Sequence, residues 1–372
     1  MFGTDYQFTK TLSFEARWDR RRLDHVIEDS AIDNPAIGET FVIVNPGQGV
    51  NATFNGFCDF LYSTDPSGCV SANGAYPPTN TIPAARSYDG VEFRLNKAMS
   101  NHWFAMASYT YSHFRGNYTG LTSSDIADGG TGGRNAPNNS RSFDEPYFSW
   151  NALGQSSSGL LPTDRPNKFK GFAYYRLAWL HRLTTDFGVF QYFYQGSPNT
   201  TYGDVGLSYD AFPVDLVSRG KWINIMQNAT TGAITVGNPY TYRNPWYIQS
   251  DFNVTQAFKI GESKEINIQG TFTNMFNQHV VTAVNEQVDT PYGGNQYITP
   301  NGLAANQGTA FYAAAESAYP IQTSLNGAPV NGQPSNSTTS GGAGPITLSS
   351  EYGKPLFYQL PRNIRLAVHF TF

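Results

Sequence analysis

Charge is scarce in this sequence of 372 residues, since charged residues make up 14% against about 25% in a typical soluble domain. The formal net charge is only -4, from 24 basic and 28 acidic residues, which argues against a protein that neutralises nucleic-acid phosphates. There are two cysteines, and the longest apolar run covers only residues 310–315. Because a transmembrane helix needs about 18 apolar residues in a row, we expect none.

Aromatic and turn-forming residues are abundant instead. Aromatics make up 15% of the chain, with 23 Tyr and 26 Phe, and there are 36 Gly and 22 Pro, while the mean hydropathy is -0.40. In a transmembrane β-barrel only alternate residues touch lipid, so the hydropathy of each strand averages out. The composition therefore favours an all-β protein, and in particular such a barrel.

Alternation with a period of two predicts the strands. At the end of the chain one side carries large apolar residues, and the other carries Arg365, Ala367 and His369. The apolar side consists of Ile364, Leu366, Val368, Phe370 and Phe372. The same alternation recurs upstream and predicts about eight strands, near 8–22, 84–99, 103–116, 166–180, 183–197, 244–260, 264–282 and 357–372.

The connections between these strands alternate strictly in length. Three are tight, around 100–102, 181–182 and 261–263, and four are long, covering 23–83, 117–165, 198–243 and 283–356. Outer-membrane barrels alternate short periplasmic turns with long extracellular loops in this way. We therefore predict that residues 1–372 form one segment of an antiparallel transmembrane β-barrel. A soluble secreted β-sandwich would explain the alternation within strands, but not the alternation of loop lengths.

The polar sides of the predicted strands carry charges, namely Glu15, Arg17, Lys170, Arg176 and Asp251. Such charges suit a wide, wet channel or a contact with a plug better than the tight interior of a closed eight-stranded barrel. We therefore expect eight strands alone to form an open or strained barrel. The first residues show no signal-peptide pattern, although a barrel must be exported, so we expect a fragment of a larger protein.

Several segments resemble a known family. They are RLDHVIED (22–29), VEFRL (91–95), WFAMASYTYS (103–112), RGNY (115–118), LPTDRP (161–166), NMFN (274–277) and RNIRL (362–366). Together they resemble the C-terminal part of the barrel of TonB-dependent outer-membrane receptors, in the Oar-like branch that often carries a carboxypeptidase-regulatory-like domain. The resemblance covers essentially the whole chain, but the plug and the TonB box of that family have no counterpart in it.

The resemblance implies energy-coupled uptake of a scarce, bulky ligand (a siderophore, a glycan or a peptide) across the outer membrane of a Gram-negative bacterium. It implies contact with outer-membrane lipid and lipopolysaccharide, and with TonB only through the missing N-terminal region. It further implies that the last strand, with Ile364, Leu366, Val368, Phe370 and the terminal Phe372, is the signal that the barrel-assembly machinery reads. An exposed strand edge that can template pairing is the physical basis of such a signal.

Two groups of loop residues are candidates for local roles. Cys58 and Cys69 form an isolated pair in a predicted exported loop, which favours a disulfide, with two free thiols as the alternative. Arg20, Arg21 and Arg22 could bind lipopolysaccharide phosphates, but a solvated rim with local acidic partners is the simpler interpretation.

No catalytic motif is found, and neither a metal site nor a cofactor is predicted. We therefore expect a protein that is not an enzyme. Two other functions remain open: a self-standing eight-stranded outer-membrane barrel that acts as an adhesin or structural protein, and a soluble secreted carbohydrate-binding β-protein.

Overall fold

The computed structural model describes residues 1–34, 38–45, 83–119, 157–180, 182–206, 211–215, 217–227, 234–261, 263–288 and 349–372. Every regular element in these ranges is a β-strand, and most of the strand residues belong to one antiparallel sheet. No helix in these ranges is long and apolar enough to cross a membrane. The prediction of an all-β, antiparallel fold is confirmed.

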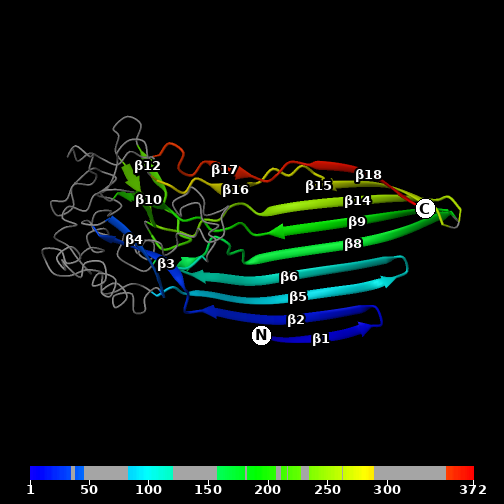
Figure 1. The fold of residues 1–372 in the computed structure, drawn as a ribbon, viewed down its shortest axis with the longest axis horizontal. Coiled ribbons are helices and arrows are strands. Elements are labelled where there is room, and N and C mark those ends of the chain that lie inside the picture. The colour runs from blue at the N-terminus through cyan, green and yellow to red at the C-terminus, as the bar shows by residue number, and fades with distance from the viewer. Residues whose placement is uncertain are drawn as a thin grey trace.

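Nine strands follow one another across the main sheet, in the order β1-β2-β5-β6-β8-β9-β14-β15-β18 (Figure 1). Strands of 9 to 15 residues, such as β15 and β5, reach about 30 to 50 Å, which is enough to cross a hydrocarbon layer of about 30 Å. A short tenth strand, β7 (Gly159–Leu160), pairs with β6. The nine long strands are β1 (Phe2–Thr9), β2 (Leu12–Leu23), β5 (Arg86–Ser100), β6 (Trp103–Gly116), β8 (Asn167–Leu180), β9 (Leu183–Tyr194), β14 (Tyr247–Lys259), β15 (Glu265–Thr273) and β18 (Asn363–Thr371).

Four tight turns lie at one end of the main sheet, near the C-terminus, and the longer connections lie at the other end (Figure 1). The three tight turns that the sequence predicts are confirmed. In the β5–β6 turn, Asn101 and His102 have φ angles of 51° and 69°. Two successive left-handed residues match the right-handed twist of a hairpin, and Asn tolerates this conformation better than most residues.

The fourth tight turn, at Lys10 and Thr11, separates β1 from β2 and is absent from the sequence prediction. The prediction of one strand over 8–22 is wrong at its start, because β1 pairs with β2 over Phe2 to Thr9. A two-residue turn leaves the period of two intact, so Phe8 and Leu12 keep the same parity across it. Neither Lys10 nor Thr11 is a typical turn residue, so residue type does not indicate the turn either.

Two predicted strands are shorter than expected. The strand predicted over 264–282 ends at Thr273, because Asn274 turns the chain with a φ of 52°. The segment predicted as one strand over 357–372 is divided in two. Its first part belongs to β17 (Pro355–Tyr358), which pairs with β16 (Val281–Val284), and β18 begins only after Pro361, which has no N–H to donate.

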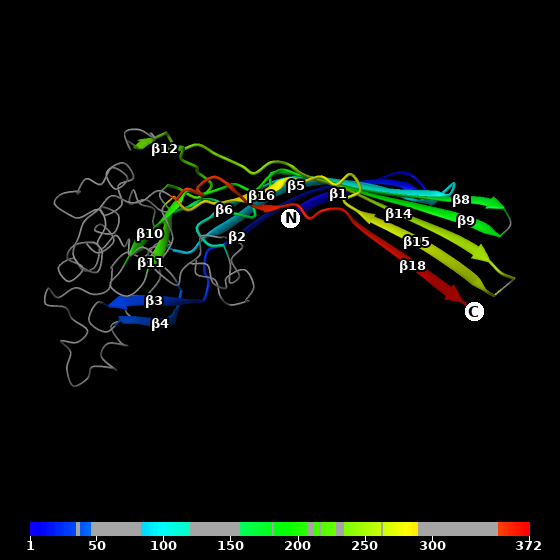
Figure 2. The same ribbon diagram turned by 90° about the horizontal axis from the view of Figure 1, so that it is seen from above.

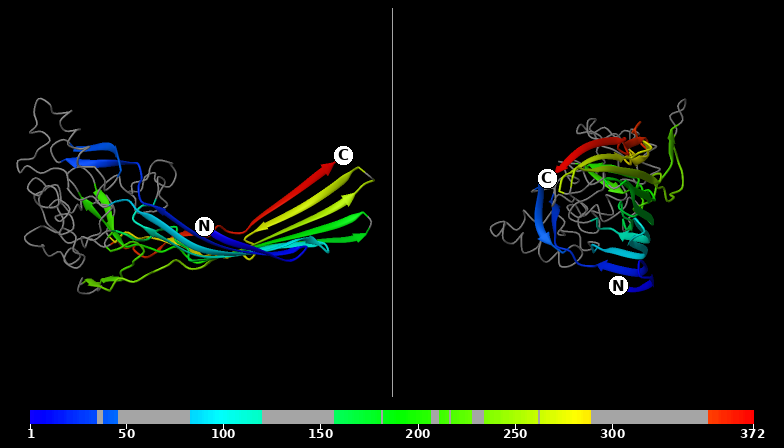
Figure 3. Two further views of the ribbon diagram at one scale, coloured as in Figure 1. Left: turned by 90° about the horizontal axis from the view of Figure 1, so that it is seen from below. Right: turned by 90° about the vertical axis from the view of Figure 1, so that its right-hand side faces the viewer.

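The main sheet is open. Its edges are β1 and β18, and among the described strands β1 pairs only with β2 and β18 only with β15. Seen end-on, the strands follow an arc with β18 and β1 at opposite ends (Figure 3). The expected open barrel is confirmed, and the closed eight-stranded alternative does not match this sheet. Each edge presents a row of backbone N–H and C=O groups that no other described strand pairs with.

The register gives the sheet two chemically different faces. Directly paired residues of antiparallel strands point to the same side. One continuous row across six strands consists of Trp103, Tyr175, Phe187, Val254, Gly270 and Leu366. The neighbouring row, on the opposite side, consists of Phe104, Tyr174, Gly188, Asn253, Thr271 and Arg365. We call the side of the first row the apolar face and the side of the second row the polar wall.

The tightest core of the described residues lies at the end of the long connections, not on the main sheet. Its largest fully buried side chains are Leu161, Ile223 and Val288, whereas Leu366 on the apolar face is 77% exposed. Small two-stranded sheets gather at this end (Figure 2). They are formed by β3 (Glu28–Asn34) with β4 (Gly38–Val44), β10 (Tyr202–Gly206) with β11 (Ala211–Asp215), β12 (Ile225–Gln227) with β13 (Ile234–Val236), and β16 with β17.

A half-buried tyrosine, Tyr352, is packed against this core. The Tyr352 ring stacks on Trp222 with centroids 4.5 Å apart and planes 2° from parallel. Its hydroxyl donates to the Ile223 carbonyl at 2.7 Å and lies 2.6 Å from Thr201 Oγ1. Burial raises the pKa of this hydroxyl well above its usual value, so it stays neutral at physiological pH. The segment that leads into β17 is therefore fixed to the chain between β10 and β12.

Candidate functional site

The polar wall is the face that carries the predicted interior charges. Register pairs Arg17 with Glu92 and Arg176 with Asp186, and it places Lys170 opposite Ser108 on the same side. Glu15 and Asp251 belong to this side as well. The alternation of the sequence therefore assigns all five charges to the correct face.

Ion pairs link β2 to β5 on the polar wall. Arg17 lies 2.7 Å from Glu92, which also lies 2.9 Å from Arg94. Arg94 and Asn96 both reach Glu15, at 3.3 and 3.0 Å. These side chains keep between about a fifth and a half of their surface exposed, so each pair contributes only about 0 to 1 kcal/mol. The network pairs each of these charges with an opposite charge, and the polar wall stays hydrophilic.

A second pair lies directly across β8 and β9. Arg176 Nε and Nη2 donate to the two carboxylate oxygens of Asp186 at 2.8 and 3.0 Å, in a two-point contact. Arg176 Nη2 also donates to the Tyr174 hydroxyl at 2.8 Å. A planar guanidinium suits this fork geometry, which fixes the direction of both side chains.

An aromatic strip crosses the polar wall on β6, β8 and β9. Phe172 lies between Phe104 and Phe190, with ring centroids 5.1 and 4.2 Å away, and Tyr174 stacks on Phe104 at 5.1 Å. Farther towards the long connections, Tyr194 stacks on Tyr247 at 6.0 Å. Rings at these separations attract one another and offer flat apolar surface within a polar wall. The sequence prediction identifies the polar residues of this wall and misses the strip.

The NMFN segment (274–277) links β14, β15 and β18 by hydrogen bonds at the ends that lie near the long connections. Asn274 is 1% exposed, and its side-chain amide donates to the carbonyls of Gln278 and Leu360, both at 2.9 Å. Its side-chain oxygen accepts the N–H of Gln278 at 2.8 Å, and its own N–H donates to Asp251 at 2.8 Å. Asp251 is therefore partly engaged in holding a turn, and it is not a free charge of the wall.

The LPTDRP segment (161–166) forms similar stabilising contacts beside β6. The Asp164 side chain is fully buried and forms a close ion pair with Arg243. It also accepts the backbone N–H of Phe114 at 2.6 Å, and Arg243 donates to the carbonyls of Asp164 and Gly196 at 3.0 and 3.1 Å. A buried pair with these additional hydrogen bonds has most of its polar groups satisfied. Two segments that carry the family resemblance thus hold the loop ends of the strands.

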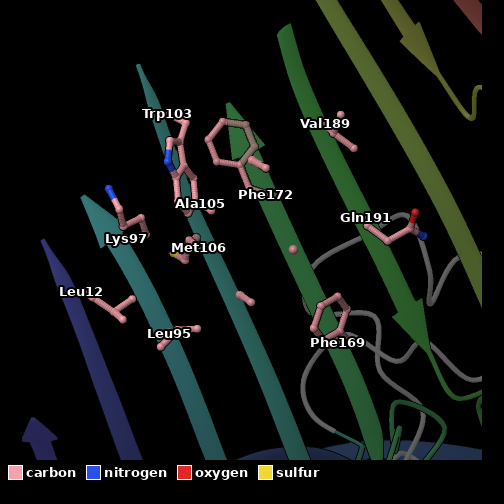
Figure 4. A pocket seen from close by; sticks show the side chains of 13 residues that line it. Leu12, Leu95, Lys97, Trp103, Ala105, Met106, Phe169, Phe172, Val189 and Gln191 are labelled. Carbon is pink, nitrogen blue, oxygen red and sulfur yellow. The ribbon is translucent and has the colours of Figure 1, made fainter. Parts of the chain in front are cut away.

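The apolar face carries a groove of about 350 Å³ across β5, β6, β8 and β9 (Figure 4). Small residues line its middle, and Leu95, Phe169 and Val189 are among its larger lining residues. Lys97 lies at the tight-turn end, with Nζ 4.6 Å from the Trp103 ring centroid and donating to the Ala98 carbonyl at 2.7 Å. A lysine stem along apolar surface, with its amine beside a tryptophan, is typical of a membrane–water interface.

Two of the three arginines at the end of β2 have the acidic partners that the simpler interpretation requires. Arg21 pairs with Asp19 at 2.6 Å, and Arg20 pairs with Asp89 of β5 at 3.4 Å. Asp19 is a local partner, two positions from Arg21 in the sequence, whereas Asp89 lies opposite Arg20 on the next strand of the sheet and is identified only from the register.

The structure bears differently on the predicted disulfide and on the predicted assembly signal. Cys58 and Cys69 lie outside the described residues, so their disulfide stays a prediction. Ile364, Leu366, Val368 and Phe370 lie together on the apolar face of the edge strand β18, opposite the apolar row of β15. Phe372 follows β18 and is 88% exposed. Recognition of this strand by the assembly machinery stays a prediction.

Comparison with known proteins gives one informative similarity. No family model matches the chain, and no solved structure matches it significantly. The chain is 23% identical over 370 residues to the TonB-dependent transporter Oar of Myxococcus xanthus. The match covers all of this chain and 27% of that protein. The resemblance to Oar-like TonB-dependent receptors is thus confirmed as a distant homology, in which the chain spans about a quarter of the length of its relative.

Proposed function

We propose that this chain is one segment of the wall of an outer-membrane β-barrel that belongs to a TonB-dependent receptor in a Gram-negative bacterium. The observation that carries the proposal is the division of the nine-stranded sheet into an apolar face and a polar wall. The apolar face would contact lipid, and the polar wall would line the passage of a bulky ligand. Barrels of this kind alternate apolar and polar residues in this way.

The open edges fit a segment of a larger barrel. Unpaired backbone groups cost several kcal/mol each in hydrocarbon, so an open sheet cannot remain in a bilayer by itself. Further strands on β1 and β18 would satisfy both edges. The charges of the polar wall suit the wide lumen of such a barrel, or its contact with a plug, where water and opposite charges are available.

The proposal includes four partners and no catalytic step. Lipid and lipopolysaccharide would contact the apolar face, and the barrel-assembly machinery would read the strand that ends in Phe372. TonB would act through a region outside this chain. A siderophore, a glycan and a peptide are equally compatible with a wall of polar and aromatic side chains.

Fractionation of cells that produce the whole barrel protein, of which we propose this chain is a segment, tests this function. We expect it to sediment with lipopolysaccharide in the outer-membrane fraction of a sucrose gradient and to resist carbonate extraction. A peripheral outer-membrane protein is the control for extraction. Recovery in the soluble periplasmic fraction would contradict the proposal and favour a secreted β-protein.

The two alternative functions receive less support. A self-standing barrel would need β1 to pair with β18, and these strands are the separate edges of the sheet. A soluble sandwich would need a second sheet over the apolar face. Among the described residues, the other sheets are two-stranded and lie at the end of the long connections (Figure 2).

A further inference from the structure

A pocket of about 610 Å³ opens between β2, β5 and β6 where these strands meet the long connections. Its volume lies in the range of small-molecule sites, which is about 300 to 1,000 Å³. Four arginines and two aromatic residues dominate the lining, with one carboxylate. The lining residues are Arg17, Asp19, Arg21, Arg22, Leu23, Arg86, Tyr88 and Phe114.

The charges of this pocket are not balanced. Asp19 pairs with Arg21 at 2.6 Å, and Glu92, which lies outside the lining, pairs with Arg17 at 2.7 Å. No carboxylate among the described residues forms an ion pair with Arg86. The pocket therefore retains positive charge after its internal pairs are counted, although the chain as a whole carries a net charge of -4.

Arg86 is held in place by groups that leave its charge intact. Its Nη1 donates to the Thr119 carbonyl at 3.2 Å. Its guanidinium carbon lies 5.6 Å from the ring centroids of both Phe114 and Tyr118. Stacking on two rings and one bond to a carbonyl orient the guanidinium and leave other N–H groups free to donate. A pre-oriented guanidinium loses less entropy when it binds an anion.

The rings beside Arg86 widen what the pocket can accept. Tyr88 and Phe114 meet edge to face, with centroids 6.4 Å apart, directly across β5 and β6. A ligand that combines an oxyanion with a flat or apolar body would place the anion on the guanidinium and the body against the rings. A neutral ligand would leave the excess positive charge uncompensated.

We infer that this pocket binds a small solute through its carboxylate or phosphate oxyanions, with Arg86 as the principal contact. The inference rests on the proposed function, because it treats the polar wall as the surface that meets the transported ligand. It narrows the ligand class of the receptor to solutes that present a carboxylate or phosphate group to this pocket.

The test is equilibrium dialysis of radiolabelled citrate and radiolabelled pyrophosphate against the whole barrel protein that contains this segment, folded in detergent micelles at low ionic strength, with raffinose as the neutral probe. We expect saturable binding of at least one anion and none of raffinose. The anion that binds more tightly distinguishes carboxylate from phosphate recognition. No saturable binding of either anion to the wild-type protein would overturn the inference.

Two arginine variants form a matched pair. Arg86→Gln and Arg115→Gln remove the same charge, and register places Arg115 beside Ser87, on the apolar face. We expect Arg86→Gln to weaken binding about tenfold and Arg115→Gln less than twofold. Equal effects of the two variants would mean that only overall charge matters and would overturn the inference.

Additional variants keep the test decisive if Arg86→Gln does not fold. Arg86→Lys keeps the positive charge but loses the two-point donor geometry of the guanidinium. Arg21→Gln removes a second lining guanidinium. Each should weaken anion binding at least threefold relative to Arg115→Gln. Unchanged binding in both would overturn the inference. A wild-type protein that fractionates with the outer membrane but binds neither anion would contradict the pocket alone, and not the proposed function.

Discussion

Replacing Asn274 by alanine should strongly destabilise the loop ends of β14, β15 and β18. The substitution removes three side-chain hydrogen bonds of 2.8 to 2.9 Å at a site that is 1% exposed. At about 1 kcal/mol each, their loss costs about 3 kcal/mol. Alanine at a φ of 52° adds about 1 kcal/mol, so we expect a decrease of about 4 kcal/mol in the free energy of unfolding.

Glycine at the same position separates the two contributions. Asn274→Gly loses the same hydrogen bonds but accepts the left-handed backbone, so it should cost about 3 kcal/mol and remain about 1 kcal/mol better than alanine. Urea titration of the whole barrel protein in micelles, followed by tryptophan fluorescence, measures both variants against wild type. If alanine and glycine cost the same, or if both cost less than about 1 kcal/mol, the reasoning about this turn is refuted.

Three further predictions concern the faces, the cysteines and the chain end. In the whole barrel protein in lipid vesicles, Leu366→Arg on the apolar face should lower the free energy of unfolding by about 2 to 4 kcal/mol, and Ala367→Arg on the polar wall by much less, as reversible unfolding would measure. Cys58 and Cys69 should form a disulfide, and an intact mass without the two-hydrogen difference on reduction would exclude it. Removal of Phe372 should slow barrel assembly, and a wild-type rate of appearance of the heat-modifiable form would argue against the signal.

The face of each strand residue can be predicted from the sequence because it depends only on local parity. Leu366 and Arg365 lie on opposite sides, as alternation requires, and the same holds for Val254 and Asn253. The β1–β2 turn cannot be predicted in this way, because the two residues Lys10 and Thr11 leave the alternation unchanged. Parity identifies the side of the sheet, but it does not identify the neighbours across it.

The candidate site depends on those neighbours, and so the sequence predicts little of it. Phe172 and Phe190 stack only because register places them opposite each other, although 18 positions separate them in the chain. The pocket likewise needs Arg21, Tyr88 and Phe114 on three strands in one register. The motif around Asn274 can be recognised in the sequence. Its role in linking three strands by hydrogen bonds cannot, because its partner Leu360 follows a long connection.

Site-directed labelling of β18 tests most directly whether this sheet has one face in lipid and one in water. Single cysteines are introduced by Leu366→Cys, Val368→Cys, Ala367→Cys and His369→Cys, after Cys58→Ser and Cys69→Ser, in the outer-membrane-embedded protein. Positions 366 and 368 should react with a lipid-phase label and resist a charged aqueous label, and positions 367 and 369 should do the reverse. Equal labelling of both pairs by both reagents would contradict a membrane wall with two faces.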